Sequence, residues 1–215
     1  VQTCALPISE RDADTIIFNT EDAVAASIQP PKVDIPVFKL VSEDHPILKE
    51  VLPEFDFKNP PVNPNEFASS LTETCKIHKG YGLSANQCGF KYRVFVMGTG
   101  DDYVAHFNPK VVKEYDSAHM VEGCLSFPFM GLHITRPAMV DVEYQDFDGN
   151  VKTATYSGIT ARCFQHELDH MNGIVYTSRV KPLALQQGMK KRNKLKNMVK
   201  KMDKNLKKIT NGNTN

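Results

Sequence analysis

The spacing of apolar residues changes several times along this chain of 215 residues. Between Asn65 and Gly80, apolar side chains recur every three or four positions, which is the period of a helix with one buried face. Phe67, Leu71 and Cys75 fall on that face. We expect Asn65 to cap this helix and Gly80 to end it, because asparagine is a preferred N-cap and glycine readily takes the left-handed conformation after a helix.

Strand patterns occupy the middle of the chain. A proline-rich loop is predicted at residues 53–64, and a short strand is expected before it at residues 37–41. Short apolar runs predict three more strands, at residues 94–97, 103–107 and 111–112. In residues 140–144 and 151–155, β-branched or aromatic side chains stand at every second position. Asp148-Gly149 between these segments is a turn signal, and together they predict a β-hairpin.

A second helical segment is predicted from about residue 157 to residue 172. It contains no proline, its first residues include Ser157 and Thr160 as candidate N-caps, and Asn172-Gly173 is the expected stop. The order helix, strands, helix predicts an α+β fold, with largely antiparallel sheets around this central helix.

The central helix carries an H-E-x-x-H motif, His166-Glu167-Leu168-Asp169-His170. Two histidines four residues apart lie on one face of a helix, so both imidazoles can reach one metal ion, and Glu167 can move protons beside it. The alternative is a helix whose histidines and acids lie on a solvated or buried face without a metal.

A catalytic site of this kind needs a third protein ligand. Tyr176 stands where the extended protease motif has its third histidine, and no histidine, cysteine or glutamate follows His170. The third ligand must therefore precede the helix. Cys124 is the best placed upstream residue, because it lies among loop-forming residues and a metal deprotonates a coordinating thiol. An ordinary buried cysteine is the alternative.

Three segments resemble, in this order, the signature motifs of the peptide deformylase family: residues 80–87 (GYGLSANQ), 122–126 (EGCLS) and 165–170 (QHELDH). The resemblance extends from about His45 to Val180. It implies hydrolytic removal of the formyl group from formyl-methionine at the N-terminus of newly made polypeptides. Another peptide-directed metallohydrolase, such as a deacylase, and a ribosome- or RNA-binding module with a degenerate site are the alternatives.

The resemblance also implies roles for individual residues, which we state as expectations. The metal ligands are Cys124, His166 and His170, and the metal is one divalent ion, Fe(II) in the cell, with Zn, Ni or Co able to take its place. Glu167 is the general base and acid, while the side chain of Gln87 and the backbone N–H of Leu125 stabilise the oxyanion. Tyr81, Gly82 and Glu122 are expected to bind substrate.

The chain departs from the family pattern in two places, the first of them mild and the second affecting the expected contacts with the substrate peptide. Ser84 and Asn86 replace residues that are frequently alanine and proline or threonine. The basic residue that often follows the second motif, and helps to hold the substrate peptide, has no counterpart before Arg136. We expect Glu122 to pair with Arg136 and stiffen this loop, and Cys163 to be a buried neighbour of the site, not a ligand.

Composition limits the class of protein. Hydrophobic residues make up 41% and charged residues 24%, as in soluble globular proteins, and no run approaches the roughly 18 apolar residues of a transmembrane helix. The five cysteines are an odd number without disulfide spacing, which indicates a reducing compartment. We expect a cytoplasmic protein, of a bacterium or of a phage in a bacterial host.

We expect three regions along the chain. Residues 1–36 form an N-terminal arm, of which residues 1–9 are expected to be non-native because they read as the translation of a sequencing adapter. Residues 37–182 form the catalytic domain, and residues 183–215 form a basic helical tail.

The tail concentrates positive charge. Residues 190–208 hold ten basic residues and one acid, although the whole chain carries only +1. Leu195, Val199, Met202, Leu206 and Ile209 form an apolar stripe on the predicted helix. We expect this helix either to dock on ribosomal RNA near the nascent chain, or to rest its stripe on the body of the protein. An acidic membrane surface or a partner helix is a further alternative.

Overall fold

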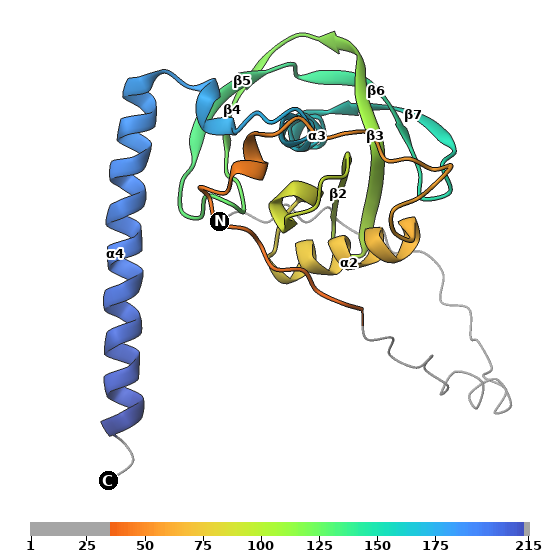
Figure 1. Ribbon diagram of the computed structural model, residues 1–215. Coiled ribbons are helices and arrows are strands. Elements are labelled where there is room, and N and C mark those ends of the chain that lie inside the picture. Colours follow the sequence, from red (N-terminus) through yellow and green to blue (C-terminus); the bar gives the residue numbers. More distant parts are fainter. Residues whose placement is uncertain (1–34, 213–215) are drawn as a thin grey trace, which may run out of the picture. The chain divides into compact units, whose positions relative to one another are not determined.

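The computed structural model describes residues 35–212, with side chains up to residue 206, as a mixed α and β structure (Figure 1). The larger sheet contains five strands, in the spatial order β1 (Gly82–Ser84), β2 (Val94–Thr99), β3 (Asp102–Tyr115), β6 (Met139–Gln145) and β7 (Val151–Ser157). A two-stranded sheet pairs β4 (Ala118–Glu122) with β5 (Leu132–Arg136). Every neighbouring pair of strands is antiparallel.

The described helices are α2 (Pro64–Ile77), α3 (Gly158–Met171) and α4 (Pro182–Gly212), with short 3-10 turns η1 (Pro46–Lys49), η2 (Ala85–Cys88) and η3 (Tyr176–Arg179). Figure 1 shows α3 end-on, between the larger sheet and the β4–β5 pair. The expected α+β class, with antiparallel sheets around the motif helix, is confirmed.

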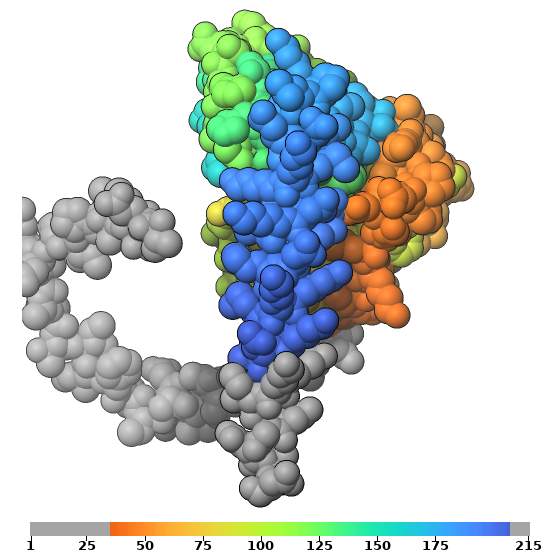
Figure 2. Space-filling model, turned by 90° about the vertical axis from the view of Figure 1, so that its left-hand side faces the viewer, coloured from red at the N-terminus to blue at the C-terminus, as the bar shows by residue number. Residues whose placement is uncertain are grey.

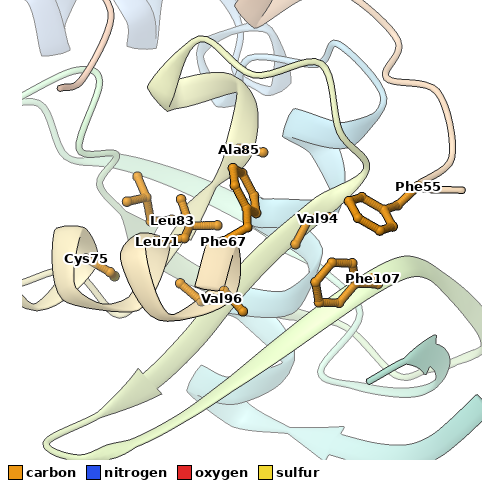
Figure 3. Packing of buried hydrophobic residues seen from close by; sticks show 10 residues of the cluster. Phe55, Phe67, Leu71, Cys75, Leu83, Ala85, Val94, Val96 and Phe107 are labelled. Carbon is orange, nitrogen blue, oxygen red and sulfur yellow. The ribbon is translucent and has the colours of Figure 1, made fainter. Parts of the chain in front are cut away.

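Strand β2 separates two hydrophobic cores, because its side chains alternate between the faces of the sheet. Val94 and Val96 join Phe67, Leu71 and Phe107 on the α2 side, as Figure 3 shows. On the opposite face, Phe95 and Met97 belong to the core that α3 completes with Ala161, Phe164 and Met171. The apolar side of the motif helix is thus held on the sheet, and its polar side is left for the β4–β5 pair.

Helix α2 begins earlier than the sequence predicted. The cap is Asn63, not Asn65, because the Asn63 side chain accepts hydrogen bonds from the backbone N–H groups of Asn65 and Glu66. Pro64 then occupies the first helical position, where its missing N–H costs nothing. Two asparagines flank this proline, and only the one before it is placed to cap.

The end of α2 also differs from the prediction. The helix stops at Ile77, and the left-handed residue after it is Lys79, with φ of 55°, not Gly80. The Gly80 N–H bonds to the Cys75 carbonyl and the Lys79 N–H to the Lys76 carbonyl, which is the Schellman pattern. This turn directs the chain into the Gly80-Tyr81-Gly82 segment of the site.

The strand predictions are partly right. The β6–β7 hairpin is confirmed, and the runs at 94–97, 103–107 and 111–112 lie in β2 and β3, the last two in one irregular strand. The strand expected at residues 37–41 is wrong. That segment joins no ladder, because the Phe38 N–H bonds to the Thr74 hydroxyl and the Val41 N–H to the Gln87 carbonyl. Strands β1, β4 and β5 were not predicted.

Helix α3 ends as predicted at Asn172, followed by Gly173 with φ of 68°. A Cβ at Gly173 would lie 2.6 Å from the Lys49 carbonyl oxygen, so the close approach also requires glycine here. Helix α4 begins at Pro182, near the predicted boundary of the tail. The predicted arm lies outside the described residues except for Ile35 and Pro36. In the described part of the chain, no helix is both long and apolar enough to cross a membrane.

Candidate metal centre and active site

Helix α3 and the turn after β4 bring together the three predicted metal ligands. Because α3 is helical through the motif, His166 and His170 face the same side one turn apart. Cys124 follows β4, and its Sγ lies 3.4 Å from His170 Nε2. The candidate ligand atoms of Cys124, His166 and His170 all lie within 4.8 Å of one another. Both imidazoles are buried, which excludes the alternative of a solvated face, and their approach to the Cys124 thiol favours a metal site over a buried face without a metal.

The surroundings of the two imidazoles suit a metal ion. His166 Nδ1 lies 3.1 Å from Glu122 Oε2, which fixes the ring and leaves Nε2 to act as a ligand. Burial lowers the pKa of His170 well below its ordinary value, so this ring is neutral, as a metal ligand must be. Its Nδ1 is buried and has no hydrogen-bond partner in the described residues. At His166 burial is outweighed by hydrogen bonds with Cys124 and Glu122, which raise its pKa to about 10, so this ring releases a proton when it binds a metal. A thiolate with two imidazoles is a donor set for Fe, Zn, Ni or Co.

Glu167 is buried beside this centre. Burial raises its pKa to about 7, and its Oε2 has no hydrogen-bond partner among the described residues. A Cβ at Gly82 would lie 2.6 Å from Glu167 Oε1, so the carboxylate approaches the backbone of β1 where only glycine leaves room. A buried carboxylate without a partner is unusual in a structural role and is suited to moving a proton.

Gln87 is held in one orientation at the edge of the same centre. Its Oε1 accepts hydrogen bonds from the Ser84 N–H and hydroxyl, each at 3.0 Å. Its Nε2 donates to Ser126 Oγ at 3.0 Å and lies 3.4 Å from Cys124 Sγ. The amide oxygen is therefore occupied by hydrogen bonds from Ser84, and the amide nitrogen points toward the candidate metal ligand Cys124.

A buried network of charges supports the site from the side of β4 and β5. The Glu122 carboxylate accepts hydrogen bonds from Arg136, at 2.6 and 2.9 Å, and from Arg162, at 2.8 Å. Burial alone would raise the pKa of Glu122, but the hydrogen bonds from Arg136 and His166 hold it well below its usual range. The expected pairing of Glu122 with Arg136 is confirmed.

The network explains why Arg136 cannot replace the missing substrate-holding residue. Its side chain is only 2% exposed, and Nη1 donates to Asp169 Oδ2 at 2.7 Å. Both oxygens of Glu122 are likewise bonded within the protein. This arrangement favours an orienting role for Glu122 over direct contact with substrate.

Sequence reasoning missed several parts of this site. Arg162 carried no motif signal, and Ser126 was noted only as the last residue of the EGCLS motif, without a role. The Asn86 side chain, which donates to the His170 carbonyl at 2.8 Å, was noted only as a mild departure from the family pattern. Asp169 could have been found, because it is an acid inside the motif on the buried side of the helix. Cys163 is a neighbour of the centre, as expected, and burial raises the pKa of its thiol well above the ordinary value.

A cleft of about 400 Å³ opens beside the ligands. Its polar end includes Glu167, Gln87 and Cys124, and its remaining wall is largely apolar, formed in part by Tyr81, Leu125, Met120, Val121 and Ile159. Such a cleft is suited to an apolar side chain attached to a polar group.

The family model for polypeptide deformylase matches residues 37–186. The chain belongs to the peptide deformylase family. It is 37% identical over 147 residues to the peptide deformylase of Wolbachia pipientis wMel, covering 61% of this chain and 81% of that protein. The resemblance found in the three sequence motifs is therefore confirmed.

Solved peptide deformylases share the fold. The enzyme of Synechococcus elongatus, solved in complex with actinonin, aligns with a TM-score of 0.68 at 27% identity, covering 75% of this chain and 91% of that one. The enzyme of Acinetobacter baumannii, solved with Met-Ala-Ser bound, aligns with a TM-score of 0.64 at 25% identity, covering 68% and 99%. Peptide deformylases are metal-dependent hydrolases that act on N-terminal formyl-methionine, and this chain is an enzyme of that family.

Proposed function

We propose that the Cys124, His166 and His170 side chains hold one divalent metal ion, and that this centre hydrolyses the formyl amide of formyl-methionine at the N-terminus of new polypeptides. The observation that carries the proposal is the convergence of these three donors beside the Glu167 carboxylate, whose Oε2 has no hydrogen-bond partner among the described residues. Fe(II) is our proposal for the metal in the cell, because one soft thiolate with two imidazoles suits a redox-active ion; Zn, Ni and Co fit the same donors.

The metal would lower the pKa of water, so that a nucleophile is available at neutral pH. Glu167 takes the proton of the attacking water and returns it to the leaving amine. Gln87 Nε2 and the Leu125 N–H donate to the oxyanion that develops on the formyl oxygen. Glu122 holds the His166 ring by its Nδ1, and Arg136 and Arg162 keep Glu122 ionised.

The substrate peptide would lie along β1. This strand is at the edge of the larger sheet, paired with β2 on one side, and its first residue Gly82 lines the cleft together with the preceding Tyr81. An extended peptide can add to such an edge through backbone hydrogen bonds. The apolar wall of the cleft would take the methionine side chain, which places the formyl group at the polar end, near Glu167.

The acyl group distinguishes a deformylase from another metal-dependent deacylase. We expect turnover of formyl-Met-Ala-Ser and about a 10-fold to 200-fold lower kcat/KM for acetyl-Met-Ala-Ser, because the extra methyl group must fit beside the carbon that is attacked. The two peptides are compared by the release of free amine at equal enzyme and metal concentration. Equal turnover would favour the deacylase.

We further propose that α4 docks on ribosomal RNA, which would place the enzyme in the cytoplasm beside emerging nascent chains. Of the apolar stripe, Leu195 is partly buried, whereas Val199 and Met202 are 36% and 58% exposed. The lysines beside them, including Lys200, Lys201 and Lys204, are exposed as well. The body of the protein thus covers the start of the stripe and not Val199 or Met202.

Replacing Lys200, Lys201 and Lys204 together with glutamine is expected to weaken ribosome binding and to reduce the slope of log K against log salt by about two, since each phosphate contact contributes roughly 0.7 to 0.9. Co-sedimentation with ribosomes at several salt concentrations measures this. The matched control replaces the exposed Lys39, Lys49 and Lys58, far from α4 in sequence, with glutamine. Equal slopes for the two triple variants would argue against docking through α4.

A further inference from the structure

One side chain connects the tail helix to the turn that carries the metal ligand and the expected oxyanion donor. Among the described side chains of α4, only Arg192 is buried, with 6% exposure. Its Nε donates to the Pro128 carbonyl oxygen at 3.0 Å. Its Nη1 and Nη2 bind the Glu43 carboxylate, which lies before η1. Figure 2 shows α4, in blue, beside the orange segment that contains Glu43.

The contact reaches the active-site turn, defined here as residues 124–130. The guanidinium of Arg192 lies 5.9 Å from the centre of the Phe127 ring, and the Phe127 N–H bonds to the Cys124 carbonyl at 2.9 Å. The Phe127 ring also packs against Tyr176, whose ring centre is 5.5 Å from that of His166. Arg192 is therefore two contacts away from the ligand Cys124 and three contacts away from the ligand His166.

The active-site turn needs such support. Phe129 has φ of 67°, a left-handed conformation that a bulky side chain rarely adopts. The carbonyls on either side of it are both held, Pro128 by Arg192 and Met130 by the Tyr176 hydroxyl at 2.8 Å. Removing one of these bonds frees the turn to relax toward a more favourable backbone conformation, which would move Cys124 and Leu125.

Helix α4 is placed to make this contact by a close approach to β5. A Cβ at Gly188, one turn before Arg192, would lie 2.6 Å from Leu132 Cδ2. The absence of a side chain at Gly188 lets the helix approach the β4–β5 pair, and the Arg192 side chain then passes over the Phe127 ring to Pro128.

We infer that Arg192 is a positioning residue for the hydrolysis, which couples the tail helix to the geometry of the active-site turn. The inference rests on the proposed function, because it assigns to the turn the thiolate of Cys124 and the N–H of Leu125. It predicts that the first part of α4 contributes to catalysis, whereas the exposed lysines further along serve binding.

Replacing Arg192 with methionine, which keeps a long apolar side chain but no donors, is expected to lower kcat about 10-fold to 100-fold with less than about a threefold change in KM, because a small displacement of a reacting group has effects of that size. Amide hydrogen exchange in residues 124–130 should become about tenfold faster. Asn193→Met, at the exposed neighbouring position, is the matched control and should change neither quantity. Arg192→Lys keeps the charge beside Glu43 without the planar fork, so it should fall between wild type and Arg192→Met.

All measurements use the full metal-loaded enzyme. If Arg192→Met does not fold, kcat and the hydrogen exchange of residues 124–130 are measured for Arg192→Lys instead. An unchanged kcat in Arg192→Met, or unchanged exchange of residues 124–130, would overturn the inference. If the wild type itself releases no formate, the proposed function fails, whereas hydrogen exchange still reports whether Arg192 holds the active-site turn.

Discussion

Replacing Glu167 with glutamine is expected to lower kcat for formate release by about 10²-fold to 10⁴-fold, the usual contribution of a general acid and base. Glutamine has the same shape but cannot accept the proton of the attacking water. The carboxylate Oε2 has no partner among the described residues, so its loss breaks no structural contact of that atom. KM should change little, because the proposed peptide contacts lie along β1.

The measurement is formate release by the purified variant at saturating substrate, together with its metal content. Glu114→Gln, at an exposed position on β3, is the matched control for the chemical change and should keep full activity. Glu167→Gln with metal still bound and more than a tenth of the wild-type kcat would show that another group moves the proton.

The second large effect is expected at Glu122. Replacing it with glutamine removes the anion that lies between Arg136, Arg162 and His166. Breaking a buried ion pair by removing one partner costs about 3 to 5 kcal/mol, because the remaining charges stay buried. Loss of the His166 contact should also weaken metal binding about 10-fold to 100-fold.

Urea unfolding of the metal-free proteins at pH 7 measures the change in unfolding free energy, and a metal titration measures the affinity. The control is Glu143→Gln, which removes an exposed pair with Lys110 and should cost less than about 1 kcal/mol. Equal midpoints for the two variants would show that the buried network contributes little to stability.

Wild type and Glu122→Gln should also differ in how their stability depends on pH, and the direction of this difference follows from the pKa of Glu122. The pKa of Glu122 is lower in the folded protein than its ordinary value of 4.5. Its carboxylate therefore contributes stability that is fully present above about pH 4.5 and is lost as the pH falls toward the folded-state pKa. The stability difference between wild type and Glu122→Gln should shrink as the pH is lowered below 4.5.

What the sequence predicted correctly depends on local signals. Helix α3 could be placed because its caps, its apolar period and its histidine spacing lie within one segment. The β6–β7 hairpin could be predicted because its two strands with alternating side chains and its turn residues follow one another directly in the sequence. The absence of histidine, cysteine and glutamate after His170 directed the search for the third ligand upstream, and the resemblance of the EGCLS motif to the family assigned Cys124.

The features that the sequence did not predict depend on contacts between distant segments. β1 has only three residues, and its pairing with β2 supplies the strand character that no local pattern shows. Residues 37–41 have strand propensity but bond to Thr74 and Gln87 instead of to a strand. Arg162 meets Glu122 across 40 positions of sequence, and Arg192 meets Pro128 across 64, so neither contact has a local signature.

The two halves of α4 show the same limit. Its basic charge and apolar stripe were readable from the sequence, which left open whether the stripe rests on the body or faces a partner. In the structure the first part of the helix rests on the body, since the turns around Gly188 and Arg192 lie on β5 and the active-site turn. Further along, Val199 and Met202 of the stripe are exposed.

The most direct test of the central claim is the stoichiometry of products from formyl-Met-Ala-Ser. The full chain, loaded anaerobically with Fe(II), is incubated with the peptide, and formate and the free amine of methionine are quantified together. The Cys124, His166 and His170 centre with Glu167 predicts equal amounts of both, increasing over many turnovers. Metal bound at one ion per chain with no formate released would contradict the account.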